Sequence, residues 1–148
     1  MNDKYDALKL DNQLCFPLYA CAKEIVKRYT PFLEELDLTY TQYITMMAMW
    51  EHKKLLVKEL GRCLYLDSGT LTPLLKKLEE KGFVTRTRPK DDERNLLVTL
   101  TEQGEALREQ ALGVPAKIGA CIRMEPADAW TLYQLLHKLL GSLSQEES

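Results

Sequence analysis

The stretch VKELGRCLYLDSGTLTPLLKKLEEKG, residues 57–82, decides the fold of this chain. Its opening segment places apolar side chains three or four positions apart, as a helix with one buried face does. After a turn, Asp67-Ser68 supplies an N-cap for a second helix, and Gly82 is typical of the position that follows a helix. The second helix carries one leucine stripe: Leu71, Leu74, Leu75 and Leu78. The pattern predicts two amphipathic helices joined by a turn.

Two β-rich runs follow these helices, FVTRTR at 83–88 and NLLVTL at 95–100. The segment between them, PKDDER, has the Pro, Asp and basic residues of a hairpin tip. Together these elements predict a winged helix-turn-helix over residues 53–101. The fold class that we expect for the whole chain is mainly α with a small β-hairpin wing, in which N- and C-terminal helices form a dimerisation region.

Such a unit places the N-terminal residues of its second helix against base edges in the DNA major groove. Ser68, Thr70 and Pro73 are therefore expected to read bases or to support their reading. Lys76 and Lys77 lie farther along the same outward side and are expected to meet phosphates.

The hairpin adds basic residues at the wing, Arg86 and Arg88 on one strand and Arg94 at the start of the other. A wing of this kind can insert a guanidinium into a minor groove. Asp92 is expected to hold Arg94 in position by a charge-assisted pair, because a carboxylate at the tip otherwise repels phosphate. The alternative interpretation is a solvated turn with scattered charges.

The distribution of charge favours DNA although the whole chain is slightly acidic, with 20 Lys+Arg against 22 Asp+Glu and a net charge of -2. From Lys53 through Arg94 there are eleven basic and seven acidic residues, a local excess of four positive charges. We therefore expect a double-stranded DNA operator as partner, with an affinity that depends on salt.

The length, 148 residues, predicts a single domain over residues 1–148. The polar start and the absence of an apolar run of roughly 20 residues predict a cytoplasmic protein without a membrane partner. The cysteines, Cys15, Cys21, Cys63 and Cys121, are too scattered for a metal site, so no metal and no cofactor are expected.

Before the helix-turn-helix, Asp11-Asn12 predicts a helix from about Gln13 to Thr30, ended by Pro31 and bent at Pro17. A short helix is expected over PFLEEL, residues 31–36. A further helix is expected to start from a Thr41 cap, with these side chains in the core: Tyr43, Ile44, Met47 and Trp50.

After the wing, Thr101 is expected to cap one long helix that is disturbed around Gly113 and Pro115. A last helix restarts at Pro126 with a wide apolar stripe: Trp130, Leu132, Tyr133, Leu136, Leu139, Leu140 and Leu143. Residues 8–36 and 102–145 are expected to form a helical interface in a homodimer that reads a two-fold symmetric operator. The alternative is that the stripe folds back on its own chain.

Four motifs carry a resemblance to a known family: LDNQLCFPLYA at 10–20, LTYTQY at 38–43, LYLDSGTLTPLLKKLE at 64–79 and DDER at 91–94. The chain resembles the MarR family of winged-helix repressors, and more narrowly its organic hydroperoxide resistance regulators. The resemblance implies a dimeric repressor that leaves DNA when Cys15 is oxidised by an organic hydroperoxide. It also implies a role for Tyr40 beside that thiol.

The residues around Cys15 support such chemistry. Cys15 falls in the first turn of its helix, where the dipole favours the thiolate that attacks a peroxide. Tyr19 lies four residues on and shares its helix face. Tyr29 lies roughly 21 Å along the same helix, given a rise of about 1.5 Å per residue, so it can meet only the thiol of a second subunit.

The fate of the oxidised thiol is open between a small cellular thiol and a second protein cysteine. Cys121 is the candidate resolving cysteine, and the alternative is that it packs as a small apolar residue in the interface. We expect Cys21 and Cys63 to be core residues.

Two other functions stay open. One is a repressor of the same fold that a small aromatic ligand releases, with Cys15 structural. The other is a thiol peroxidase, although the sequence offers neither a CxxC motif nor a His or Arg beside Cys15. We therefore expect a regulator rather than an enzyme.

Overall fold

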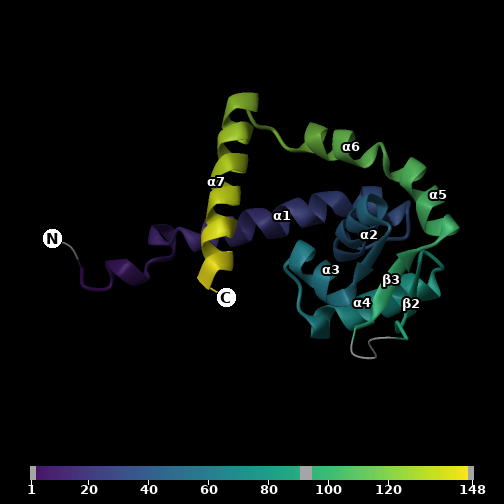
Figure 1. Cartoon of the computed structure of the whole chain (residues 1–148). Coiled ribbons are helices and arrows are strands. Elements are labelled where there is room, and N and C mark those ends of the chain that lie inside the picture. The colour runs from purple at the N-terminus through teal and green to yellow at the C-terminus, as the bar shows by residue number, and fades with distance from the viewer. Residues whose placement is uncertain (1–2, 91–94, 147–148) are drawn as a thin grey trace. The chain divides into compact units, whose positions relative to one another are not determined.

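The computed structural model describes residues 3–90 and 95–146 and is mainly helical, with one small antiparallel sheet (Figure 1). Two 3-10 turns, η1 (Asp6–Leu8) and η2 (Leu10–Asn12), come before the first α-helix. The chain divides into two compact units, Met1–Ile118 and Gly119–Ser148, which are described separately. The α-helices and strands, in chain order, are α1 (Cys15–Glu34), α2 (Tyr40–His52), β1 (Lys54–Leu56), α3 (Val57–Leu64), α4 (Ser68–Glu80), β2 (Val84–Thr87), β3 (Leu97–Leu100), α5 (Glu102–Ala111), α6 (Val114–Cys121) and α7 (Pro126–Glu146).

Helices α3 and α4 form the predicted helix-turn-helix. The Asp67 side chain caps α4 by accepting a hydrogen bond of 2.7 Å from the backbone N–H of Thr70. Gly82, with a φ of 85°, lies just beyond the end of α4. The four leucines of the predicted stripe are all buried: Leu71, Leu74, Leu75 and Leu78. Together with the hairpin of β2 and β3, these elements confirm the winged-helix fold.

The turn between α3 and α4 is tight. Gly61 makes it possible, because a Cβ added at Gly61 would lie 2.8 Å from the backbone oxygen of Leu66. The Leu66 N–H in turn donates to the Gly61 carbonyl at 3.0 Å. Tyr65 ends α3 in the left-handed conformation, with φ 56° and ψ 40°. The angle between the two helices therefore depends on a glycine inside α3.

The sheet has one strand more than the sequence predicted. Its order is β1-β3-β2 and both pairings are antiparallel. The β2–β3 hairpin was expected, whereas β1 was not. Leu55 of β1 pairs with Val98 of β3, which also pairs with Arg86 of β2. The additional strand attaches the segment between α2 and α3 to the base of the wing.

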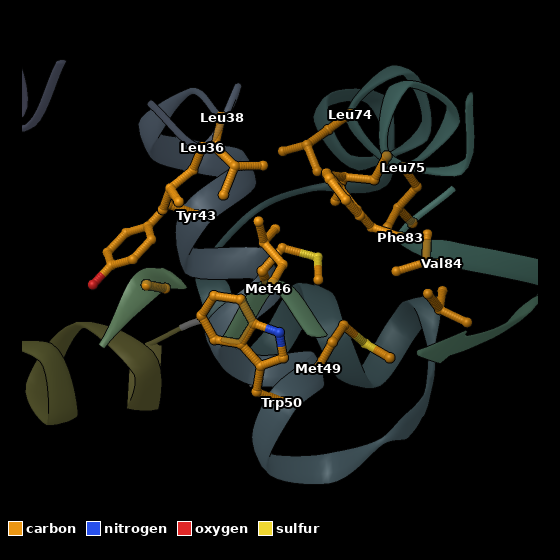
Figure 2. Close-up of a cluster of buried hydrophobic side chains, with 14 of the residues drawn as sticks. Leu36, Leu38, Tyr43, Met46, Met49, Trp50, Leu74, Leu75, Phe83 and Val84 are labelled. Atoms are coloured by element: carbon orange, nitrogen blue, oxygen red, sulfur yellow. The ribbon is translucent and has the colours of Figure 1, made fainter. Parts of the chain in front are cut away.

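The core of Met1–Ile118 is built around α2 (Figure 2). Met46 and Met49 are fully buried, and the Trp50 indole N–H donates to the Gly104 carbonyl at 2.9 Å. The prediction that Met47 lies in the core is wrong, because its side chain is 45% exposed, and Ile44 is only partly buried. Met47 therefore lies off the face of α2 that packs into the core, and Ile44 lies at the edge of that face.

Helix α1 differs from the prediction at both ends. It starts at Cys15 rather than Gln13, and no side chain caps it at Leu14. Pro17 therefore falls in the first turn, where backbone N–H groups have no partner within the helix, and no hydrogen bond is lost. Pro31 does not end α1 but lies inside it, so residues 31–34 of the short helix expected over 31–36 belong to α1 and the remaining two lie in the turn that follows.

Two other helix boundaries also change. Thr39, not Thr41, caps α2, in a capping box with Gln42. The long helix expected after the wing is two helices, α5 and α6, which separate near Gly113. Thr101 caps α5 as predicted, because its side chain accepts from the backbone N–H of Gly104 at 2.9 Å.

The unit Gly119–Ser148 consists mainly of α7, which begins at Pro126 as predicted. Its apolar residues are exposed within one chain: Trp130 at 60%, Leu135 at 58% and Leu143 at 53% are among the highest values. Over the described helices of the chain, none combines the length and the apolar character needed to cross a membrane.

A Gly61→Ala substitution tests the close approach in the turn between α3 and α4. The added methyl group meets backbone rather than a flexible side chain. We expect the free energy of unfolding in urea to fall by about 1–3 kcal/mol, the usual cost of overpacking. Gly69→Ala is the matched control, because its added Cβ would lie at an ordinary 3.5 Å from Asp67. Equal stability of the two variants would contradict the proposed role of Gly61.

Candidate DNA-binding surface and cysteine site

The outward side of α4 carries the residues that the sequence assigned to DNA. The five positions are all exposed in the structure: Ser68, Thr70, Pro73, Lys76 and Lys77. The backbone N–H of Thr70, which donates to the Asp67 carboxylate, holds the pKa of Asp67 below its usual value. The helix thus presents short polar side chains at its N-terminus and ammonium groups one turn later, an arrangement that suits a major groove.

The wing residues differ from one another in their surroundings. Arg86 pairs with Glu79 of α4, with 3.2 Å between the guanidinium Nη2 and the carboxylate Oε1. The Arg86 backbone N–H also donates to Glu79, at 2.9 Å. Arg86 therefore joins the wing to α4, while Arg88 is exposed at the end of the same strand. Asp92 and Arg94 lie outside the described residues.

Cys15 is the first residue of α1 and its thiol is exposed. Large apolar side chains surround it in sequence and are exposed as well: Leu14 at 84%, Phe16 at 41%, Leu18 at 41% and Tyr19 at 64%. This end of α1 therefore combines an exposed thiol with exposed apolar side chains.

Three tyrosines gather where α1 meets the start of α2. The ring centroid of Tyr29 lies 5.0 Å from that of Tyr40 and 5.7 Å from that of Tyr43. Burial raises the pKa of each phenol above the usual value of 10.0, and the neighbouring phenols add to the effect for Tyr29 and Tyr43. These phenols therefore stay protonated, as hydrogen-bond donors, over a wide range of pH.

The structure brings Tyr29 and Tyr40 together but leaves Cys15 and Tyr19 at the other end of α1. Because α1 is one helix from Cys15 to Glu34, its rise separates Cys15 from Tyr29 by roughly 21 Å. Tyr43 was assigned only to the core and was missed as a member of the cluster. Its position three residues after Tyr40 was the available signal, since that spacing places both on one helix face.

Two of the other cysteines, Cys21 and Cys63, do not lie where the sequence placed them. Cys21 and Cys63 are exposed, so the prediction that they are core residues is wrong for the chain as described. Cys63 lies on the outer side of α3, whose buried residue is Leu60. Cys121 is exposed at the end of α6. Among residues 3–90 and 95–146, no three His, Cys, Asp or Glu side chains gather as a metal site would require.

Comparison with known proteins supports the interpretation of this fold as a winged helix-turn-helix. The family model described as transcriptional regulator SarA/Rot matches residues 27–110, which include the tyrosine cluster and the helix-turn-helix. An organic hydroperoxide resistance transcriptional regulator of Bacillus subtilis is 46% identical over 146 residues, 99% of each chain. The chain belongs to this family of winged-helix transcriptional regulators.

Solved structures of AbfR, a protein of Staphylococcus epidermidis, are also similar to this chain. Reduced AbfR bound to DNA matches with a TM-score of 0.80 and 32% identity, over 99% of this chain and 100% of that one. Disulfide-formed AbfR matches with a TM-score of 0.63 and 36% identity, over 93% and 96% of the two chains. Relatives of this regulator are thus known in reduced, DNA-bound and oxidised forms.

The raised tyrosine pKa values predict how stability responds to alkaline pH. Because folding favours the neutral phenols, their contribution is complete below about pH 10 and is lost as pH rises through the folded pKa values. The free energy of unfolding in urea should therefore decline above about pH 10. The decline should be smaller in Tyr40→Phe, which has no phenol to ionise. An identical decline in the variant would contradict the burial of Tyr40.

Proposed function

We propose that this regulator is a homodimeric repressor that senses organic hydroperoxides through Cys15 and releases its operator on oxidation. The observation that carries the proposal is the placement of an exposed thiol and a protonated tyrosine cluster at opposite ends of α1. A second copy, crossing antiparallel, supplies to each end of α1 what that end lacks. The family to which the chain belongs supports this function.

Exposed apolar surface supports the dimer. Apolar side chains of the N-terminal segment and of α7 are open to solvent in one chain, including Leu8 at 79% and Trp130 at 60%. Apolar surface on this scale is typical of a protein interface. A two-fold dimer formed through residues 8–36 and 102–145 presents two α4 helices to two half-sites of one operator.

In the antiparallel crossing, Tyr29 and Tyr40 of the second copy approach Cys15. Their hydroxyl groups donate hydrogen bonds to the thiolate and to the bound peroxide. Tyr43 is 3% exposed and packs against Tyr29, so it supports the two donors from behind. Tyr19 shares a helix face with Cys15 and completes the surroundings of the thiol.

The chemical step is a two-electron oxidation of Cys15. The thiolate sulfur attacks the terminal oxygen of the hydroperoxide, an S–O bond forms and the O–O bond breaks. The sulfur becomes a sulfenic acid, and the leaving alkoxide takes a proton from the phenol network and departs as an alcohol. One hydroperoxide is consumed for each thiol, so the protein acts as a sensor and has no need of catalytic turnover.

The sulfenic acid then condenses with a thiol, which forms a disulfide and releases water. The thiol is either a small cellular thiol or Cys121 of the second copy. A disulfide with Cys121 requires Cα atoms about 4.4–6.8 Å apart, so the dimer helices must shift to form it. That shift spreads the two α4 helices and weakens operator binding.

Operator binding is tested at the wing. Arg94→Ala should lose operator binding while the dimer stays folded, because Arg94 enters a minor groove. Asp92→Ala should also weaken binding, although it removes a negative charge near DNA. Binding is measured by gel retention and folding by circular dichroism. If Asp92→Ala binds as tightly as the parent, the positioning role of Asp92 is wrong.

Sensing is tested with Cys15→Ser, which should bind the operator normally but stay bound after hydroperoxide treatment. Mass spectrometry of the parent should show oxidised Cys15, a change that a sensor of an aromatic ligand does not need. Release that persists in Cys15→Ser would contradict the proposal.

A non-reducing gel, run after stoichiometric hydroperoxide without added thiol, separates the two resolving routes. A covalent dimer that disappears in both Cys15→Ser and Cys121→Ser assigns the resolving role to Cys121. A monomer that carries only Cys15 oxidation products assigns it to a small thiol.

A further inference from the structure

Lys81, at the end of α4, forms bonds with residues that lie far from it in the sequence. The Lys81 ammonium donates to the backbone carbonyl of Asp37 and, at 3.2 Å, to the side-chain Oε1 of Gln42. It also pairs with the Asp37 carboxylate, whose Oδ2 lies 3.5 Å away. The Lys81 side chain is 25% exposed and Gln42 is 4% exposed. The contact with Gln42 is therefore partly shielded from water, which strengthens it, whereas the Asp37 carboxylate is 86% exposed.

The acceptors of Lys81 lie in the connection between α1 and α2, at Asp37, and in the first turn of α2, at Gln42. Gln42 closes the capping box with Thr39: its Oε1 accepts from the Thr39 N–H at 3.1 Å, and its own N–H donates to the Thr39 hydroxyl at 3.3 Å. The same Oε1 atom therefore receives both the Thr39 N–H and the Lys81 ammonium. Tyr40 lies between Thr39 and Gln42, in the first turn of α2.

Tyr40 places this turn next to the tyrosine cluster, because its ring lies 5.0 Å from that of Tyr29. Asp37 has a φ of 55°, and its N–H donates to the Glu34 carbonyl at 3.0 Å at the end of α1. The acceptors of Lys81 thus lie before and after Tyr40 in the sequence, and hydrogen bonds of Asp37 and Gln42 hold them in place. A displacement of the Tyr40 backbone moves the first turn of α2, and Gln42 with it.

Lys81 itself lies at the end of α4, the second helix of the helix-turn-helix. Its N–H donates to the Lys77 carbonyl at 3.0 Å, and its carbonyl accepts from the side chain of Gln103 at 3.3 Å. The next carbonyl, that of Gly82, accepts from the Thr101 hydroxyl at 2.6 Å. One residue therefore lies between the cap of α2, the end of α4 and the base of the wing.

We propose that Lys81 is a positioning residue that couples the tyrosine cluster to the recognition helix. Oxidation of Cys15 in one copy displaces Tyr40 of the other, and Gln42 transmits the displacement to Lys81 and so to α4. The inference rests on the proposed function, because it names the path by which oxidation weakens operator binding. It requires the contact to differ between the reduced and oxidised states.

A purely structural role for Lys81 makes a different prediction. If the contact only stabilises the fold, its loss lowers operator affinity by the same factor in both redox states. If the contact couples the two sites, its loss changes the ratio of the reduced to the oxidised affinity. That ratio is therefore the quantity to measure.

The test uses the dimer of residues 1–148 as Lys81→Met, with Lys4→Met as a control that lies outside residues 8–36, 53–101 and 102–145. Lys4 also has a contact of its own, since its ammonium lies 4.9 Å from the centroid of the Tyr5 ring. Operator Kd is measured by fluorescence anisotropy before and after hydroperoxide, with the oxidised fraction of Cys15 determined by mass spectrometry. In the reduced state, the operator Kd of Lys81→Met should lie within about threefold of that of the parent. On oxidation, the factor by which the Kd rises should be at least about tenfold smaller in Lys81→Met than in the parent, which is within the usual range of allosteric coupling. Lys4→Met should behave as the parent does.

Two further variants keep the test decisive. Lys81→Arg retains a cation and its donors, and it should restore release on oxidation. Asp37→Asn removes the carboxylate but keeps the backbone acceptor, and Asn tolerates the positive φ of this position. It should therefore weaken the coupling partially. If Lys81→Met does not fold, Asp37→Asn takes its place in the test. The proposal is overturned if Lys81→Met, or Asp37→Asn where Lys81→Met does not fold, shows the same affinity ratio as the parent once Cys15 is fully oxidised. A parent that does not release its operator on oxidation would instead contradict the proposed function.

Discussion

The unbroken course of α1 is the constraint on which the sensing account depends. Because one helix joins Cys15 to Tyr29, the rise per residue holds the thiol and the phenol roughly 21 Å apart in the same chain. In the proposed mechanism neither end of α1 is a complete peroxide site, since one end has the nucleophile and the other has the donors. The proposed site therefore needs two chains, and sensing then requires the dimer.

The placement of α2 explains how a peroxide site can influence DNA binding. Its first turn carries Tyr40, its middle fills the core with Met46 and Met49, and its end carries Trp50, which bonds to the backbone of α5. Strand β1 then leads directly into α3, and α4 follows after the turn. The core beneath the winged unit is therefore built on the helix that holds Tyr40 and Tyr43, and a rigid core transmits a displacement rather than absorbing it.

Local signals in the sequence predicted much of this fold, and long-range contacts explain what they missed. Asp67 marks the start of α4 through its side-chain cap and Gly82 marks its end through its positive φ, so the helix-turn-helix was predictable from local signals. Strand β1 has only three residues and forms through its pairing with β3, which no local pattern records. Pro31 was expected to end a helix, but burial of Leu33, 1% exposed, favours its continuation. The contact of Lys81 joins residues 44 positions apart and left no signal in the sequence.

A heterodimer experiment tests most directly whether the peroxide site is shared between two chains. In the first heterodimer one chain carries Cys15→Ser and the other carries Tyr29→Phe, so the remaining thiol faces an intact Tyr29. In the second, one chain carries both substitutions and the other carries neither, so the remaining thiol faces the Phe. The rate of Cys15 oxidation by an organic hydroperoxide is measured in each. The shared site predicts fast oxidation in the first heterodimer and slow oxidation in the second; equal rates, or the reverse order, would contradict it.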